Sequence, residues 1–143
     1  MVLTEGPAIV QYLADFKPES GLAPKNGTWE RYKLQEALNF VTSELHKGMG
    51  QLFSPAVTAE WRKAALERLD LRLKALDAML AKHDYLTGDK FSVADAYLFT
   101  VLGWSRILKI DLSPYPHIGA YLARVGARPH VVEAMKAEGL IKG

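Results

Sequence analysis

His46 and Lys47 are the first residues of this chain whose types and spacing could do chemistry. They follow an apolar-patterned helix, and two glycines, Gly48 and Gly50, come directly after them. A cation and an imidazole N–H donor next to each other stabilise a nearby anion such as a thiolate. The same pair at a helix C-terminus would stabilise the last carbonyl groups by about 0.3–1 kcal/mol. The residues alone leave both interpretations open, and the glycines suit either a helix end or a close approach to a ligand.

Ser92 and Asp95 form the most specific local signal in the chain. They stand three residues apart at the start of an apolar-patterned segment, which is the spacing of a capping box. In such a box the serine oxygen accepts from the Asp95 N–H, and the Asp95 carboxylate accepts from the Ser92 N–H. We therefore expect these two residues to begin a helix and to have a structural role.

The elements that must position these residues are all predicted to be helices. Apolar residues recur at three- and four-residue steps, and no segment shows the sustained alternation of a strand between hairpin turns. Several prolines stand where a first helical turn tolerates them. The sequence therefore predicts an all-α fold with five to seven helices. The predicted helices begin at Gly6–Pro7, Thr28, Thr58, Ser92, Pro116 and Pro129, and the first of them ends near Lys17.

Composition and charge exclude several classes of protein. The length of 143 residues suits one domain, and the net charge of +2 produces no field that would attract nucleic acid or an anionic membrane. The chain has no cysteine, so it supplies no disulfide, thiolate metal site or cysteine nucleophile. Polar residues interrupt the first apolar stretch, which therefore resembles neither a signal peptide nor a membrane span, and we expect a cytoplasmic protein. Three further histidines lack metal-ligand spacing, so no metal is expected: His83, His117 and His130.

Four segments carry a family resemblance. The segments "LTEGPAIVQYLAD", "LNFVTSELHKG", "LTGDKFSVADAYLFTVLGW" and "RPHVVEAMKAEGL" resemble bacterial glutathione S-transferases, most closely the beta class, in both order and spacing. The resemblance covers essentially the whole chain. It implies a two-domain enzyme in which a thioredoxin-like domain precedes an all-helical one. Such an enzyme adds the thiolate of its co-substrate glutathione to hydrophobic electrophiles, without a metal.

The resemblance also implies a division of the chain. Residues 1–17 correspond to the last helix of the thioredoxin-like domain, residues 18–27 to a linker, and residues 28–143 to the all-helical C-terminal domain. The sheet of the first domain and its catalytic cysteine or serine region are expected to be missing, so this chain alone is expected to be inactive. An alternative is a non-catalytic helical module that acts in dimerisation or protein interaction.

The family pattern assigns expected roles to eight residues. It places His46 and Lys47 beside the glutathione sulfur, where they would favour the thiolate. Glu5 and Gly6 match the turn that holds the γ-glutamyl end, although many members have serine in place of Gly6. The remaining positions are Asn39 and Glu44, which would reach glutathione across a dimer interface, and Tyr97 and Trp104, which would line the hydrophobic-substrate pocket. From the residues alone, an ordinary polar helix flank is the favoured explanation for Asn39 and Glu44, and core packing explains Tyr97 and Trp104 equally well.

Two surfaces predict self-association as a homodimer. In the transferase family the long helix after Thr28 meets its counterpart, and here it carries Trp29, Tyr32 and Phe40. The first helix has polar residues at only two positions, so its apolar surface, which includes Ile9, is wider than a surface helix needs. We expect the family interface to form the dimer, with the first helix folded against the bundle and partly exposed.

Overall fold

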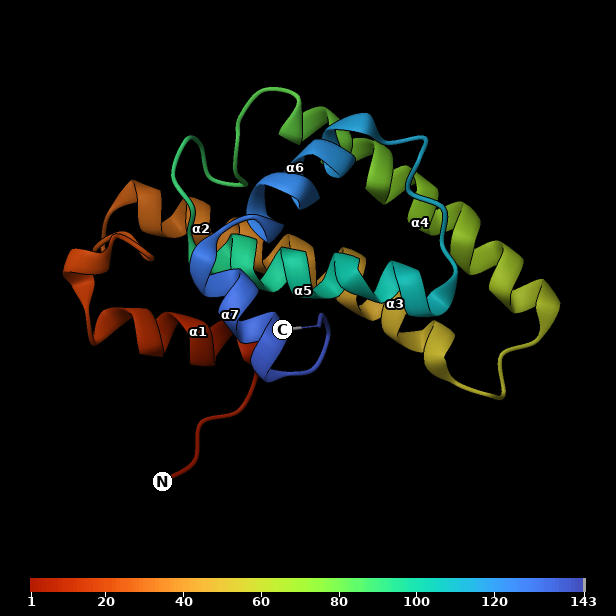
Figure 1. The fold of residues 1–143 in the computed structure, drawn as a ribbon, viewed down its shortest axis with the longest axis horizontal. Coiled ribbons are helices and arrows are strands. Elements are labelled where there is room, and N and C mark those ends of the chain that lie inside the picture. The colour runs from red at the N-terminus through yellow and green to blue at the C-terminus, as the bar shows by residue number, and fades with distance from the viewer. Residues whose placement is uncertain (143) are drawn as a thin grey trace.

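The computed structural model describes residues 1–142, and it is helical throughout (Figure 1). No strand occurs within that range, and the number of α-helices lies within the predicted five to seven. The helices are α1 (Gly6–Asp15), α2 (Trp29–Phe40), α3 (Lys47–Gly50), α4 (Ala59–Leu80), α5 (Val93–Leu108), α6 (Pro116–Gly126) and α7 (Pro129–Ala137). A π-helical segment, Val41–His46, joins α2 to α3, and the short 3₁₀ turns are Pro18–Ser20 and Gln51–Phe53.

Most helix starts lie where the sequence places them. The hydroxyl oxygens of Thr28 and Thr58 accept from the backbone N–H groups three residues later, as N-caps do. Pro116 and Pro129 are the first residues of α6 and α7. The start of α1 corrects the prediction by one residue, because the cap is Glu5, while Gly6 is already helical.

The predicted helix end at His46–Lys47 is wrong. Helical backbone continues without interruption from α2 through the π-helical segment and α3 to Phe53. Neither Gly48 nor Gly50 ends the helix, although glycine costs about 1 kcal/mol relative to alanine inside one. Packing explains why the helix continues: a methyl group added at Gly48 would lie 3.7 Å from Leu69 Cδ1 of α4. His46 and Lys47 are therefore interior helical residues and do not cap a C-terminus.

Helix α5 crosses the middle of the molecule and supplies the centre of the core (Figure 1). Its apolar side is buried and packs against α3, α6 and the π-helical segment. The buried side chains of this core include Leu98, Val101, Leu102, Val41, Leu45, Leu73, Leu76, Ile118 and Tyr121. A smaller cluster joins α1 and α2 to the start of α5.

The start of α5 is fixed by the fully buried carboxylate of Asp95. The predicted capping box with Ser92 is present, and both the N–H and the hydroxyl of Ser92 donate to the carboxylate at 2.9 Å. The same carboxylate accepts from the N–H of Leu86 and from the hydroxyl of Tyr121. Burial raises the pKa of Asp95, and these four hydrogen bonds act in the opposite direction.

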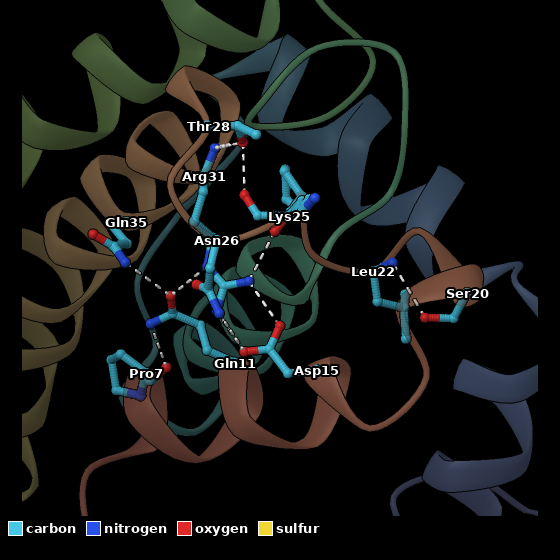
Figure 2. Close-up of polar contacts among 11 residues, drawn as sticks. Pro7, Gln11, Asp15, Ser20, Leu22, Lys25, Asn26, Thr28, Arg31 and Gln35 are labelled. Carbon is cyan, nitrogen blue, oxygen red and sulfur yellow. Dashed lines mark hydrogen bonds and ion pairs between the residues drawn. The ribbon is translucent and has the colours of Figure 1, made fainter.

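A second buried charge ties α1 to α2 (Figure 2). The guanidinium of Arg31 is 4% exposed and donates to both carboxylate oxygens of Asp15 at 2.8 Å. It also donates to the carbonyl oxygen of Pro24 in the linker and to the side-chain oxygen of Gln11. Because Arg31 lies on α2 and its partners lie on α1 and on the linker, this one side chain holds α1 against the bundle.

Helix α1 lies against the bundle with part of its apolar surface exposed, as expected. Ala14 is buried in the smaller cluster, whereas Tyr12, Leu13 and Phe16 are 55–65% exposed. On α2, Trp29 and Tyr32 are also exposed. Phe40, the third aromatic residue of the predicted interface, is partly buried against the main core. Within the described range, no helix is both long and apolar enough to cross a membrane.

Replacing Ser92 with alanine should lower the free energy of unfolding by about 0.5–2 kcal/mol, the usual cost of a lost N-cap. Chemical denaturation measures this loss. Ser113→Ala is the matched control, because Ser113 is exposed and its hydroxyl donates only to the neighbouring Asp111. An unchanged midpoint for Ser92→Ala would contradict the helix start described above.

Asp15→Asn should reduce stability at neutral pH and much less in acid. The hydrogen bonds from Arg31 hold the pKa of Asp15 below its ordinary value. A lowered folded pKa contributes stability above the unfolded value of about 3.9, and this contribution disappears as the pH falls through the folded pKa. Urea midpoints of both proteins measured between about pH 7 and pH 3 should therefore converge at the acid end. Glu19→Gln, an exposed acid-to-amide change, should leave the midpoint unaffected; a pH-independent gap for Asp15→Asn would contradict the assignment.

Candidate active site

The π-helical segment sets the direction in which His46 points. A π-helical turn is wider than an α-helical turn, so the residues after it face a different side than an α-helix would give them. The hydroxyls of Thr42 and Ser43 donate to carbonyl oxygens four residues earlier, at 2.9 Å each. Such side-chain bonds to the backbone bend helices. In this geometry the imidazole of His46 lies against α5.

Three aromatic side chains form a cluster with His46. Tyr97 and Trp104 contact its imidazole ring, and Phe53 packs against Trp104. The Nδ1 atom of His46 lies 2.5 Å from the hydroxyl oxygen of Tyr97. The ring of Trp104 stands nearly perpendicular to the imidazole, with 4.7 Å between the ring centroids. Phe53, at the end of the helical run, packs edge-on against Trp104 at 5.5 Å. The predicted positions Tyr97 and Trp104 thus share one face of α5 and both contact the predicted catalytic histidine.

The N-terminus of α1 reaches the same place. A methyl group added at Gly6 would lie 3.9 Å from Cε2 of Tyr97, so the backbone of Gly6 is close to that ring. The preceding residue, Glu5, has a φ of 71° and a ψ of 114°, which is strained for a residue with a side chain. Strain of this kind persists where the surrounding structure enforces it and clusters at ligand sites. At this N-terminus Pro7 has no N–H, and the N–H groups of Ala8 and Ile9 donate to the carbonyl oxygen of Glu5, so the N–H of Gly6 is the one suited to an anion.

The other predicted residues lie on the same helical run. Lys47 follows His46 directly and is exposed, and Asn39 is exposed near the end of α2. Glu44 is half-buried and forms an ion pair with Arg72 of α4, with 2.5 Å between Oε2 and Nε. The structure therefore brings together Gly6, His46, Tyr97 and Trp104. Glu44 instead faces α4.

A surface pocket lies away from the predicted site residues, and the described residues contain no group of metal ligands. A shallow pocket of about 490 Å³ lies at the turn between α3 and α4, and none of the predicted site residues lines it. Among residues 1–142, no three His, Cys, Asp or Glu side chains are placed to hold a metal ion together. His130 is paired with Glu133 on the surface of α7.

The arrangement has the chemistry of an anion-stabilising site beside an apolar surface. An imidazole and an ammonium come from one helical run, a helix N-terminus lies nearby, and aromatic edges line the adjoining surface. Comparison with known proteins identifies the family. The family described as "Glutathione S-transferase, C-terminal domain" matches residues 33–129. Glutathione S-transferase GstA of Escherichia coli O157:H7 is 41% identical over 97% of this chain and 69% of its own length.

The chain belongs to the glutathione S-transferase family. Bacterial members of this family are among its structural relatives. The ternary complex of BphK, a bacterial transferase, is 54% identical, with a TM-score of 0.93 over 96% of this chain and 68% of that one. Two sphingomonad transferases are each 48% identical over 97% of this chain and 69% of theirs, with TM-scores of 0.91 and 0.92; one was solved with glutathione, and the Sphingomonas chungbukensis protein is described as beta class.

Sequence reasoning missed two features of this transferase site. Phe53 was not singled out, because the predicted helix end before it removed it from the face that carries His46. Counting seven residues on from His46 along an unbroken helix would have found it. The contact between the hydroxyl of Tyr97 and His46 was also missed, since the two residues are 51 positions apart.

Proposed function

We propose that this chain supplies the helical part of a site that conjugates glutathione to hydrophobic electrophiles. The observation that carries the proposal is the meeting of Gly6, His46 and Tyr97, which come from α1, the π-helical segment and α5. In this site His46 and Lys47 face the glutathione sulfur. A thiol titrates near pH 8.5 in the absence of perturbation, and only its thiolate attacks electrophiles. A nearby ammonium and an imidazole N–H both favour that thiolate.

Glu5 and Gly6 bind the γ-glutamyl end of glutathione in this proposal. The carboxylate of Glu5 accepts from the ammonium of the tripeptide, and the N–H of Gly6 donates to its carboxylate. The positive φ of Glu5 supports a ligand role, because this backbone conformation is strained for a residue with a side chain, and such strain clusters at ligand sites. Glycine at position 6 offers only its backbone donor, without the serine hydroxyl that many family members have.

The electrophile binds against the aromatic surface of Trp104 and Phe53. Their edge-on packing continues outward from His46, so an apolar substrate placed there lies beside the sulfur that attacks it. Holding two reactants in contact lowers the barrier by removing the entropy cost of bringing them together. No group on the substrate needs to be charged, which suits the conjugation of hydrophobic electrophiles.

We also propose a division of the chain into three segments. Residues 1–17 belong with a thioredoxin-like domain, residues 18–27 form the linker, and residues 28–143 form the helical domain. The 143-residue polypeptide alone then conjugates glutathione poorly, since its residues contact only part of the tripeptide. A purely non-catalytic module is the less favoured alternative, because the relatives reported above are transferases and the site residues are present together.

A chimera with a thioredoxin-like first domain tests the function. We expect it to conjugate glutathione to chlorodinitrobenzene, and we expect Lys47→Ala to raise the pKa of the bound thiol by roughly 0.5–1 unit, since an exposed cation is partly screened. Ultraviolet absorbance of the bound thiolate measures the shift.

Lys63→Ala is the matched control, because Lys63 is an exposed lysine of α4 and its loss removes the same charge. A folded chimera without conjugation activity contradicts the proposed function. An unshifted titration in Lys47→Ala contradicts the role of that lysine alone.

We propose in addition that the transferase is a two-fold dimer formed through α2. Trp29 and Tyr32 are 73% and 58% exposed on its first turns, and large exposed aromatic side chains are typical of interface cores. Such a dimer presents Asn39 of one chain to the glutathione of the other. Glu44 contacts that glutathione only if its ion pair with Arg72 is broken.

Charge substitution distinguishes this interface from the exposed face of α1. Tyr32→Glu should convert the dimer to a monomer in light scattering at micromolar concentration, because an unpaired charge cannot be buried in the interface. Leu13→Glu, at an equally exposed position of α1, should leave the dimer intact. A monomeric native chain, or dissociation by Leu13→Glu alone, contradicts the proposal.

A further inference from the structure

We propose that Tyr97 is a positioning residue that fixes the tautomer of His46 and directs its Nε2–H toward the glutathione sulfur. This inference rests on the proposed function and deepens it. A tyrosine that only lined an apolar pocket would not need its hydroxyl group, and the inference gives the hydroxyl of Tyr97 a task. The observation behind it is the 2.5 Å contact between the Tyr97 hydroxyl oxygen and Nδ1 of His46.

The hydroxyl of Tyr97 is the donor in this contact. A neutral imidazole has one N–H and one bare nitrogen, and the partner of one nitrogen determines which of them carries the proton. If Nδ1 carried it, the tyrosine hydroxyl would accept from Nδ1–H, and its own proton would go to solvent, because His46 is the one protein partner of this hydroxyl within residues 1–142. With the hydroxyl donating to Nδ1, both groups are satisfied and the proton of the imidazole lies on Nε2.

The surroundings of the ring leave Nε2 as the free polar atom. Tyr97 occupies the Nδ1 side, and a methyl group added at Gly50 would lie 3.8 Å from Cδ2 on the opposite side. The ring of Trp104 stands at 88° to the imidazole and restricts its rotation. The outer edge, made of Cε1 and Nε2, is the edge that is left to face a ligand.

The tautomer of His46 decides whether its imidazole stabilises or destabilises the thiolate of glutathione. A thiolate is an acceptor, so a donating Nε2–H stabilises it, whereas a bare nitrogen lone pair would repel it. Groups that orient a functional histidine through its other nitrogen act in the same way at metal and catalytic sites. Tyr97 therefore contributes through His46, and its ring remains free to contact the backbone at Gly6.

The tautomer can be measured directly in the 143-residue chain without glutathione. Long-range ¹H–¹⁵N correlation spectra at about pH 8.5, two units above the ordinary imidazole pKa of about 6.5, report which ring nitrogen carries the proton. His46→Gln identifies the signals of His46 among the four histidines. In the native chain we expect an unprotonated Nδ1 and a protonated Nε2.

Tyr97→Phe removes only the hydroxyl and should shift both nitrogen signals toward a mixture of tautomers. Tyr85→Phe is the matched control, because Tyr85 is half-buried like Tyr97, and its hydroxyl accepts only a long contact from Arg128. It should leave the His46 signals in place, and the backbone amide spectrum of each variant shows whether the fold is intact.

A protonated Nδ1 in the native chain overturns the proposal, and this result does not depend on any variant folding. Unchanged His46 signals in a folded Tyr97→Phe protein overturn it as well. Both outcomes are separate from the proposed function: a chimera without conjugation activity would remove the function and leave the tautomer assignment standing.

Discussion

The fold depends most on the buried carboxylate of Asp95. It accepts hydrogen bonds from the capping serine, from the loop at Leu86 and from Tyr121 of α6, so one side chain joins two other segments to the start of α5. The position of that start fixes the face of every later residue of the helix, because each residue turns by about 100°. A shift of one residue would carry the hydroxyl of Tyr97 away from His46. The interaction that stabilises the core therefore also aligns the site.

Two further constraints bring residues of the site to Tyr97 of α5. The Arg31 guanidinium holds α1 in place, and with it the backbone of Gly6 beside Tyr97. The π-helical segment carries His46 to the hydroxyl of the same tyrosine. A buried guanidinium and a widened helical turn are both unfavourable in isolation, the first because the charge loses water and the second because its backbone geometry is rare. Each of them positions a residue that contacts Tyr97.

Much of the candidate site could be predicted because its signals are local or belong to a family pattern. The capping box, the threonine caps and the helix-starting prolines each involve residues within a few positions of one another, so their spacing alone identifies them. The family resemblance identified Gly6, His46, Tyr97 and Trp104, which the structure brings together. Phe53 and the ion pair of Glu44 with Arg72 were not predicted, because both depend on how a helix continues and on what another helix places beside it.

The sequence by itself determined the all-helical class, the starts of α2, α4, α5, α6 and α7, and the membership in the transferase family. These follow from apolar periodicity, short-range capping chemistry and the order of four motifs. Tertiary structure decided that the helix passes through Gly48 and Gly50, since packing against Leu69 of α4 outweighs the weak helix propensity of glycine. It also decided the pairing of His46 with Tyr97, because a hydrogen bond between residues 51 positions apart exists only once the helices that carry them are packed together.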